Sequence, residues 1–228
     1  MLVAKEYTAN VKGMSKYDGI KALVLYCICI AILFLQGQVY RTNLSVNILN
    51  TLQLIFPLIP LALVLIFILL AKQKFASIGL TSKRVKQSLL LGLVLSILFI
   101  AGIIFYISIV ENTSVKLQFP SLTVFIIFIV GALQEEIFFR GYIQTRLAGL
   151  IKSSIVCSIL TAFLFLLVHY PVRWVVAGFS LSALPPFYVA CLLILHFLCS
   201  WVYKKTNCLW GAVILHLLYN FGQSMLIF

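Results

Sequence analysis

Seven long apolar runs constrain this chain more than any other feature of its sequence. They lie at roughly residues 20–35, 46–71, 88–110, 122–147, 154–168, 187–203 and 208–228, and short polar segments separate them. A helix of about 20 apolar residues can cross the hydrocarbon core of a bilayer. Because backbone groups in lipid must be hydrogen-bonded within the protein, we expect an all-α, polytopic transmembrane bundle of about seven spans, within a range of six to eight.

The composition excludes most other classes of protein. Hydrophobic residues make up 63% of the chain and charged residues 10%, against about 45–50% and 25% in soluble domains. The net charge of +12 does not indicate nucleic acid, because the cations are scattered through short connections and form no basic face. We therefore expect no nucleic-acid partner, and a lipid bilayer with anionic headgroups instead. The six cysteines lie in or beside apolar runs without a C-x-x-C pair, so we expect free thiols.

The basic residues predict an orientation in the membrane. With the N-terminus inside, alternating spans place fourteen lysines and arginines on the inner side and three on the outer side, namely Arg41, Lys116 and Arg173. Such a bias is typical of a cytoplasmic N-terminus. The polar connection 72–87 holds five cations. We divide the chain into N-terminal spans with this basic linker, 1–110, and a core, 111–228.

The fourth apolar run carries charges that need an explanation. Glu135 and Glu136, two of the five acidic residues, lie in its second half together with Arg140. A charged side chain at the centre of a membrane helix costs roughly 2.5–3.5 kcal/mol on insertion scales, so such residues usually have a function. Glu136 and Arg140 are four residues apart and can form an ion pair, whereas Glu135 points about 100° away. One carboxylate is then left available, unless all three residues form a structural charge cluster.

Further polar side chains lie in the later spans. His169 follows Phe165 by one turn, and His216 shares a helical face with Asn220. At about 1.5 Å per residue these side chains come to depths similar to that of Glu135, so we expect them to converge on one hydrated cavity. His169 alone would also fit a structural role. His196 has no polar partner at helical spacing, and we interpret it as structural.

The segment 170–186 is apolar but interrupted by prolines. It fits either a short interfacial or re-entrant piece that covers a cavity, or an ordinary outer loop. Irregular backbone at membrane depth needs protein or water around it. The two interpretations remain open at this point.

Three motifs follow one another along the later spans. They are E-E-x-x-x-R at Glu135, Glu136 and Arg140, F-x-x-x-H at Phe165 and His169, and H-x-x-x-N at His216 and Asn220. In this order, over roughly residues 120–221, they resemble the CPBP family of intramembrane proteases, which includes the type II CAAX prenyl endopeptidases and the bacterial Abi or bacteriocin-immunity proteins. The resemblance implies a CAAX-protease-like intramembrane endopeptidase that hydrolyses a peptide bond of a membrane-associated peptide or protein.

The same resemblance implies roles for the site residues. Glu135 would activate a water as general base, and His169 would help to orient the water or the carboxylate. His216 and Asn220 would donate hydrogen bonds to the developing oxyanion. Glu136, paired with its arginine, would support the helix.

Two alternatives accompany this interpretation. Glu135, His169 and His216 could bind zinc with an open water position, and the family has often been labelled metalloprotease; we favour a metal-free site because H-E-x-x-H is absent. The protein could also be a non-catalytic membrane interaction protein, such as a bacteriocin self-immunity protein or a scaffold. A scaffold has no need of Glu135 beside a paired Glu136, which favours the enzyme. We expect a bacterial plasma membrane as its location.

Overall fold

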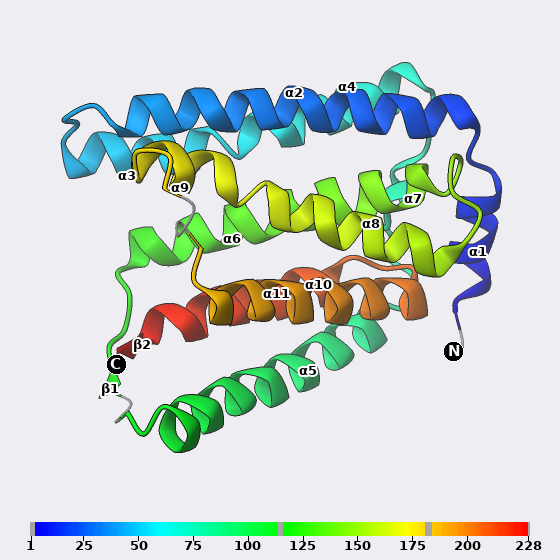
Figure 1. Cartoon of the computed structure of the whole chain (residues 1–228). Coiled ribbons are helices and arrows are strands. Elements are labelled where there is room, and N and C mark those ends of the chain that lie inside the picture. The colour runs from blue at the N-terminus through cyan, green and yellow to red at the C-terminus, as the bar shows by residue number, and fades with distance from the viewer. Residues whose placement is uncertain (1–2, 114–115, 181–183, 228) are drawn as a thin grey trace.

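The computed structural model describes residues 3–113, 116–180 and 184–227, which are almost entirely helical (Figure 1). The elements in order are α1 (Lys5–Lys12), α2 (Lys16–Tyr40), α3 (Val46–Ile55), α4 (Leu58–Leu70), the 3₁₀ helix η1 (Phe75–Ile78), α5 (Val85–Phe105), the π-helix η2 (Tyr106–Val110), β1 (Lys116–Leu117), α6 (Leu122–Glu136), the π-helix η3 (Ile137–Ile143), α7 (Gln144–Leu147), α8 (Ser154–Leu167), α9 (Tyr170–Val176), α10 (Pro186–Thr206), α11 (Trp210–Met225) and β2 (Leu226–Ile227).

The predicted helical membrane bundle is confirmed. Among the described residues, six helical segments are long and apolar enough to cross a membrane, judged by length and composition: Lys16–Tyr40, Val46–Leu70, Val85–Val110, Leu122–Leu147, Ser154–Val176 and Pro186–Thr206. The seventh apolar run forms α11, which has 16 residues and is shorter than the roughly 20 that a straight span needs. The count of six lies at the lower limit of the predicted range.

Short polar side chains set where several spans begin. Ser15 and Asp18 form a capping box at the start of α2, and the Ser121 and Ser153 side chains accept backbone N–H groups at the starts of α6 and α8. Such caps satisfy donors that the first helical turn leaves free. At the other end of α10, Asn207 has a φ of 53° and ends the helix in the left-handed region.

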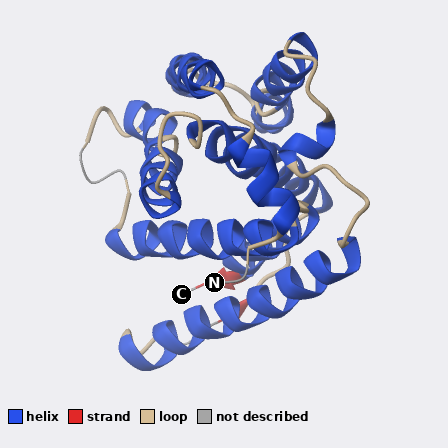
Figure 2. Ribbon diagram, turned by 90° about the vertical axis from the view of Figure 1, so that its right-hand side faces the viewer, coloured by secondary structure: helices blue, strands red, loops and turns tan. Residues whose placement is uncertain are grey.

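The long helices lie alongside one another in layers (Figures 1 and 2). α2 and α4 form one side, α5 forms the opposite side, and α6, α8, α10 and α11 lie between them. α5 packs along α11, and α2 packs against α9. The turn formed by η3 and α7 lies in the centre of the core, with Phe138, Phe139 and Ile143 at most 1% exposed.

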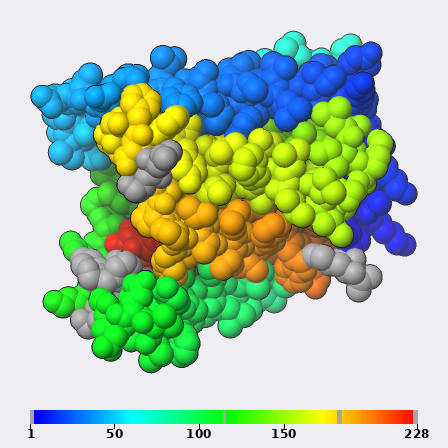
Figure 3. Space-filling model, viewed as in Figure 1, coloured from blue at the N-terminus to red at the C-terminus, as the bar shows by residue number. Residues whose placement is uncertain are grey.

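The bundle has two distinct ends. At one, which we call the basic end, lie the N-terminus, α1, the starts of α2 and α5, and the ends of α7 and α10 (Figure 1). At the other, which we call the β end, β1 pairs antiparallel with β2 through Lys116 and Ile227 and through Leu117 and Leu226. The space-filling view shows the C-terminal part of the chain, in red, at that end, between the orange of α10 and the green of the 100–120 region (Figure 3).

The proline-interrupted segment 170–186 begins as a short helix. α9 follows α8 after a brief turn at Val168 and His169, and it packs against α2. Residues 181–183 of the segment lie outside the described residues. The part that is described places α9, which contains Tyr170 and Arg173, at the β end of the bundle (Figure 1).

The outer faces of the helices are apolar. Leu70, Leu90 and Leu98 are 77%, 63% and 63% exposed. A soluble protein rarely exposes such faces over large areas, whereas a helix in lipid does. The molecule is therefore an integral, multi-pass membrane protein.

Candidate active site

The charged residues of the fourth span lie where its helix changes geometry. α6 ends at Glu136 and continues as the π-helix η3, and such π-turns often occur at functional sites. The Glu136 and Arg140 side chains are fully buried, with Oε1 of Glu136 2.9 Å from Nη1 of Arg140. The pairing predicted from their spacing is thus present. Glu135 does not share it, and its side chain is 27% exposed.

His216 connects the last helix to this ion pair. Its Nδ1 lies 2.8 Å from Oε1 of Glu136. Because the ionised Glu136, paired with Arg140, can only accept, Nδ1 carries the proton, and a neutral imidazole then has its lone pair on Nε2. That Nε2 lies 3.9 Å from Oε2 of Glu135.

His169 meets Glu135 from the turn between α8 and α9, in the same manner. Its Nδ1 lies 2.8 Å from the carbonyl oxygen of Phe165, one turn earlier, to which it donates. Its Nε2 lies 3.9 Å from Oε2 of Glu135. A neutral His169 therefore also turns a lone pair towards the carboxylate.

Three acceptor atoms consequently face one another: Oε2 of Glu135 and the two Nε2 atoms of His169 and His216. The separations of 3.9 Å are too long for direct hydrogen bonds. Oε2 of Glu135 is buried and has no hydrogen-bond partner among the described residues. A water between these atoms can donate to two of them, Glu135 and one imidazole, so the arrangement is suited to binding and polarising a water.

The Phe165 ring packs against the charged and imidazole side chains of this site. The guanidinium carbon of Arg140 lies 4.4 Å from the ring centroid, and the His169 and His216 rings lie 5.0 and 6.2 Å from it. The F-x-x-x-H spacing placed Phe165 and His169 on one face but gave no sign of its contacts with other helices. His196 packs beside the same ring at 5.5 Å, fully buried.

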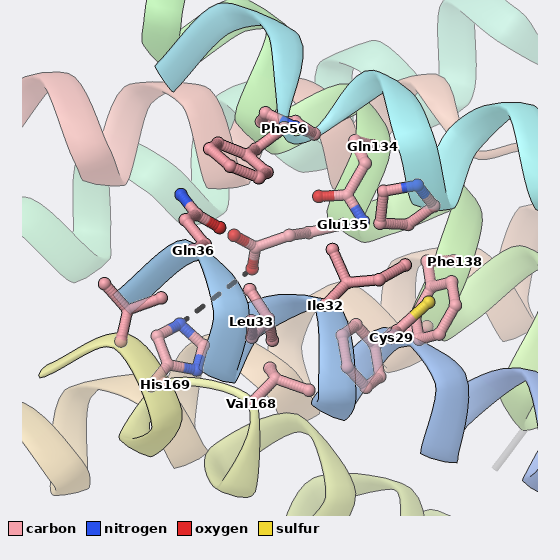
Figure 4. A pocket seen from close by; sticks show the side chains of 14 residues that line it. Cys29, Ile32, Leu33, Gln36, Phe56, Gln134, Glu135, Phe138, Val168 and His169 are labelled. Carbon is pink, nitrogen blue, oxygen red and sulfur yellow. Dashed lines mark ion pairs between the residues drawn. The ribbon is translucent and has the colours of Figure 1, made fainter. Parts of the chain in front are cut away.

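Two cavities share Glu135 and His169. The first, which we call the apolar cavity, has a volume of about 190 Å³ and lies between α2, the α3–α4 junction, α6 and the α8–α9 turn. Figure 4 shows Glu135 and His169 extending towards each other across it, with Gln36 and Phe56 nearby. Its other lining residues are Cys29, Ile32, Leu33, Pro57, Pro60, Gln134, Phe138, Phe139, Val168 and Val172.

The second, which we call the polar cavity, has a volume of about 400 Å³. It lies between α6, α9, α10 and α11, and Glu135, His169, His216 and Asn220 all line it. The structure thus brings the four predicted site residues to one space. His196 is not among the described residues that line either cavity.

The sequence analysis missed several lining residues. Arg173, four residues after His169, lines the polar cavity, and its guanidinium carbon lies 4.4 Å from the Tyr188 ring centroid. The same four-residue spacing that joined the other motifs would have indicated Arg173. Gln36 and the rest of the α2 wall could not be found in this way, because they come from a distant part of the chain.

Glu135 lies farther from each imidazole than two ligands of one zinc ion lie from each other. Two ligands bound to one tetrahedral zinc at about 2.0–2.1 Å lie about 3.4 Å apart, less than the 3.9 Å between Glu135 and each imidazole. No group of three or more His, Cys, Asp or Glu residues suited to a metal ion is found in the described part of the chain. Both histidines have the lone pairs that a metal needs, but the spacing favours a bridging water.

Comparison with known protein families places the three motifs inside a matched domain. Residues 117–222 match the family model described as Type II CAAX prenyl endopeptidase Rce1-like. The matched range includes every residue of the three motifs. No curated protein and no solved structure matches the chain.

Proposed function

We propose that this chain, whose residues 117–222 form a domain of the Rce1-like family, hydrolyses a peptide bond of a membrane-associated peptide or protein with Glu135 as its general base. Membership of this family supports a CAAX-protease-type intramembrane endopeptidase. The observation that carries the catalytic assignment is the convergence of Oε2 of Glu135 with Nε2 of His169 and of His216.

Glu135 is the residue able to take a proton. A water that donates to its carboxylate and to Nε2 of His169 has its oxygen lone pair free to attack a carbonyl carbon. As the new C–O bond forms, the water proton passes to Glu135, and the same proton then goes to the leaving amine when the C–N bond breaks. Glu136 is not suited to this role, since its carboxylate is fully buried and its Oε1 is in contact with both Arg140 and His216.

The developing oxyanion needs hydrogen-bond donors. The Asn220 amide can donate whatever the protonation state of the site. His216 donates through Nε2 only as an imidazolium, because its Nδ1 proton is directed to Glu136; that carboxylate stabilises the cation. An oxyanion donor of this kind typically lowers the activation barrier by about 2.7–4 kcal/mol.

Glu135→Gln is the decisive variant. We expect it to abolish processing while the protein still accumulates in membranes, because the amide preserves the volume and removes the base. Comparison of the membrane peptidomes of cells with active and Glu135→Gln protein would identify the substrate and the cleavage position. Glu111→Gln, at an exposed glutamate remote from the site, is the matched control. If processing continues in Glu135→Gln membranes, the enzyme assignment is wrong and a scaffold or immunity function is favoured.

The site is proposed to work without a metal. We expect a strong chelator to leave peptide cleavage by the purified protein unchanged, since the separations of 3.9 Å are suited to water. Cleavage that the chelator stops and added zinc restores would reverse this proposal. The partners are then the bilayer and a peptide substrate, and a bacterial plasma membrane is the proposed location.

A further inference from the structure

The cations of this chain lie mainly at one end of the bundle. The basic end carries thirteen of the seventeen: Lys5, Lys12, Lys16, Lys21, Lys72, Lys74, Lys83, Arg84, Lys86, Arg146, Lys152, Lys204 and Lys205. The β end carries Arg41, Lys116 and Arg173, and Arg140 is buried between the ends. Helical membrane proteins keep their lysine- and arginine-rich connections in the cytoplasm. The basic end is therefore the cytoplasmic end.

The polar cavity extends from Glu135 towards the opposite end. Glu135 is the fourteenth residue in a segment of twenty-six, close to the middle of its helix. Gln223 and Ser224 continue the cavity wall one turn beyond Asn220, where α11 approaches β2. Arg173, which is exposed, lines the cavity from α9 at the same end. The wall thus continues with polar side chains towards the β end.

The route from Glu135 towards the basic end is filled by packed side chains. Ile137, Phe138, Tyr142 and Leu147, which follow Glu135 along the same segment, are at most 4% exposed. Below them the buried Arg146 donates to the carbonyl oxygen of Ser77 at 3.1 Å and so joins this segment to η1. A closely packed protein interior leaves no passage for a peptide.

We propose that the polar cavity is the entrance for substrate and that it opens on the non-cytoplasmic face of the membrane. The peptide bond then reaches Glu135 from outside. The substrate class is an exported peptide, or the non-cytoplasmic flank of a membrane-anchored one, entering as an extended segment beside Arg173, Gln223 and Ser224. The inference rests on the proposed function only in naming a peptide as the occupant, because the direction of opening is independent of catalysis.

Labelling of single cysteines tests the direction. In a Cys27→Ser background, which removes the cysteine that is exposed, Gln223→Cys reports on the cavity. Lys116→Cys and Lys12→Cys, both at exposed positions, report on the β end and the basic end. The full chain is produced in a bacterial inner membrane and treated with a small, charged methanethiosulfonate, either in spheroplasts or in inside-out vesicles. The Cys27→Ser parent gives the background from the five buried cysteines.

We expect Gln223→Cys and Lys116→Cys to be modified at least tenfold faster in spheroplasts than in inside-out vesicles, and Lys12→Cys to show the reverse. Modification of Gln223→Cys from the vesicle side would overturn the proposal, and so would its protection from both sides while Lys116→Cys reacts. Glu135→Gln in the same background should label identically. The direction of opening and the hydrolytic activity are thereby tested separately.

Discussion

Glu135 and Glu136 are adjacent and chemically identical, yet their surroundings give them different properties. Glu136 is fully buried with Arg140 and His216 as its partners. Glu135 is partly exposed to two cavities and has no partner within hydrogen-bond distance of its Oε2. A paired carboxylate maintains the fold, whereas an unpaired one facing two imidazoles is free for proton transfer.

Glu136→Gln should therefore damage the fold, in contrast to Glu135→Gln. Loss of the carboxylate leaves the Arg140 guanidinium buried without a counter-charge, which typically costs about 3–5 kcal/mol. We expect a lower apparent Tm in detergent and a reduced yield from membranes. The double variant Glu136→Gln with Arg140→Met should recover part of the stability but not the activity. Equal Tm values for Glu136→Gln and the unmodified protein would contradict this assignment.

Local spacing predicted the ion pair but not its third member. Glu136 and Arg140 are neighbours on any helix, so their pairing is visible in the sequence. The hydrogen bond from His216 to Glu136 joins residues 80 positions apart in the sequence. Helical periodicity predicts contacts only between residues a few positions apart. That bond fixes the proton of His216 on Nδ1 and so decides what its Nε2 can do in the site.

The helix that carries the glutamates differs from the regular α-helix expected over 122–147. Its central turn, η3, is a π-helix that places Gly141 against η1. A Cβ at Gly141 would lie 2.8 Å from the carbonyl oxygen of Ile78, so only glycine permits this approach. The apolar pattern does not reveal the π-turn, because every residue of η3 is buried and burial therefore shows no periodicity.

The packing of α5 against α11 positions His216, and two glycines permit it. A Cβ on Gly211 would clash with the backbone of Ser88, and one on Gly92 would clash with the backbone of Gly211. The Ser88 hydroxyl also accepts the Gly211 N–H at 2.9 Å. Neither contact is visible in the sequence, where both positions read as ordinary glycines in apolar runs.

Gly211→Ala should consequently displace α11. Overpacking of this kind costs about 1–3 kcal/mol, and a shift of about 1 Å at a catalytic group can reduce turnover about 10²-fold. We expect slower peptide cleavage and a lower Tm. Gly102→Ala is the matched control, because an added Cβ there meets no atom within 4 Å among the described residues. The prediction is wrong if both variants retain full activity.

Hydropathy predicted the helical bundle and the approximate number of spans, since both depend on the length of the apolar runs. It could not predict that the first helices complete the site. The apolar cavity has α2 and the α3–α4 junction as one wall, although no motif lies in either. The division of the chain at residue 110 stays a prediction, and helices from both sides of that point pack together.

A chain divided in the basic linker tests how far the core depends on those helices. Residues 83–228 contain all three motifs and begin at the basic end, so their expected orientation is retained. Alone they lack the α2 wall and the bond from Tyr26 Oη to the carbonyl oxygen of Leu164, which measures 3.0 Å. We expect this fragment to be degraded and inactive, and co-expression with residues 1–82 to restore a complex that copurifies and cleaves peptide.

Ala22→Leu in residues 1–82, at a fully buried position, should prevent rescue, whereas Val24→Leu, at a position 50% exposed, should not. Cleavage by 83–228 alone at the rate of the intact protein would show that the α2 wall is dispensable.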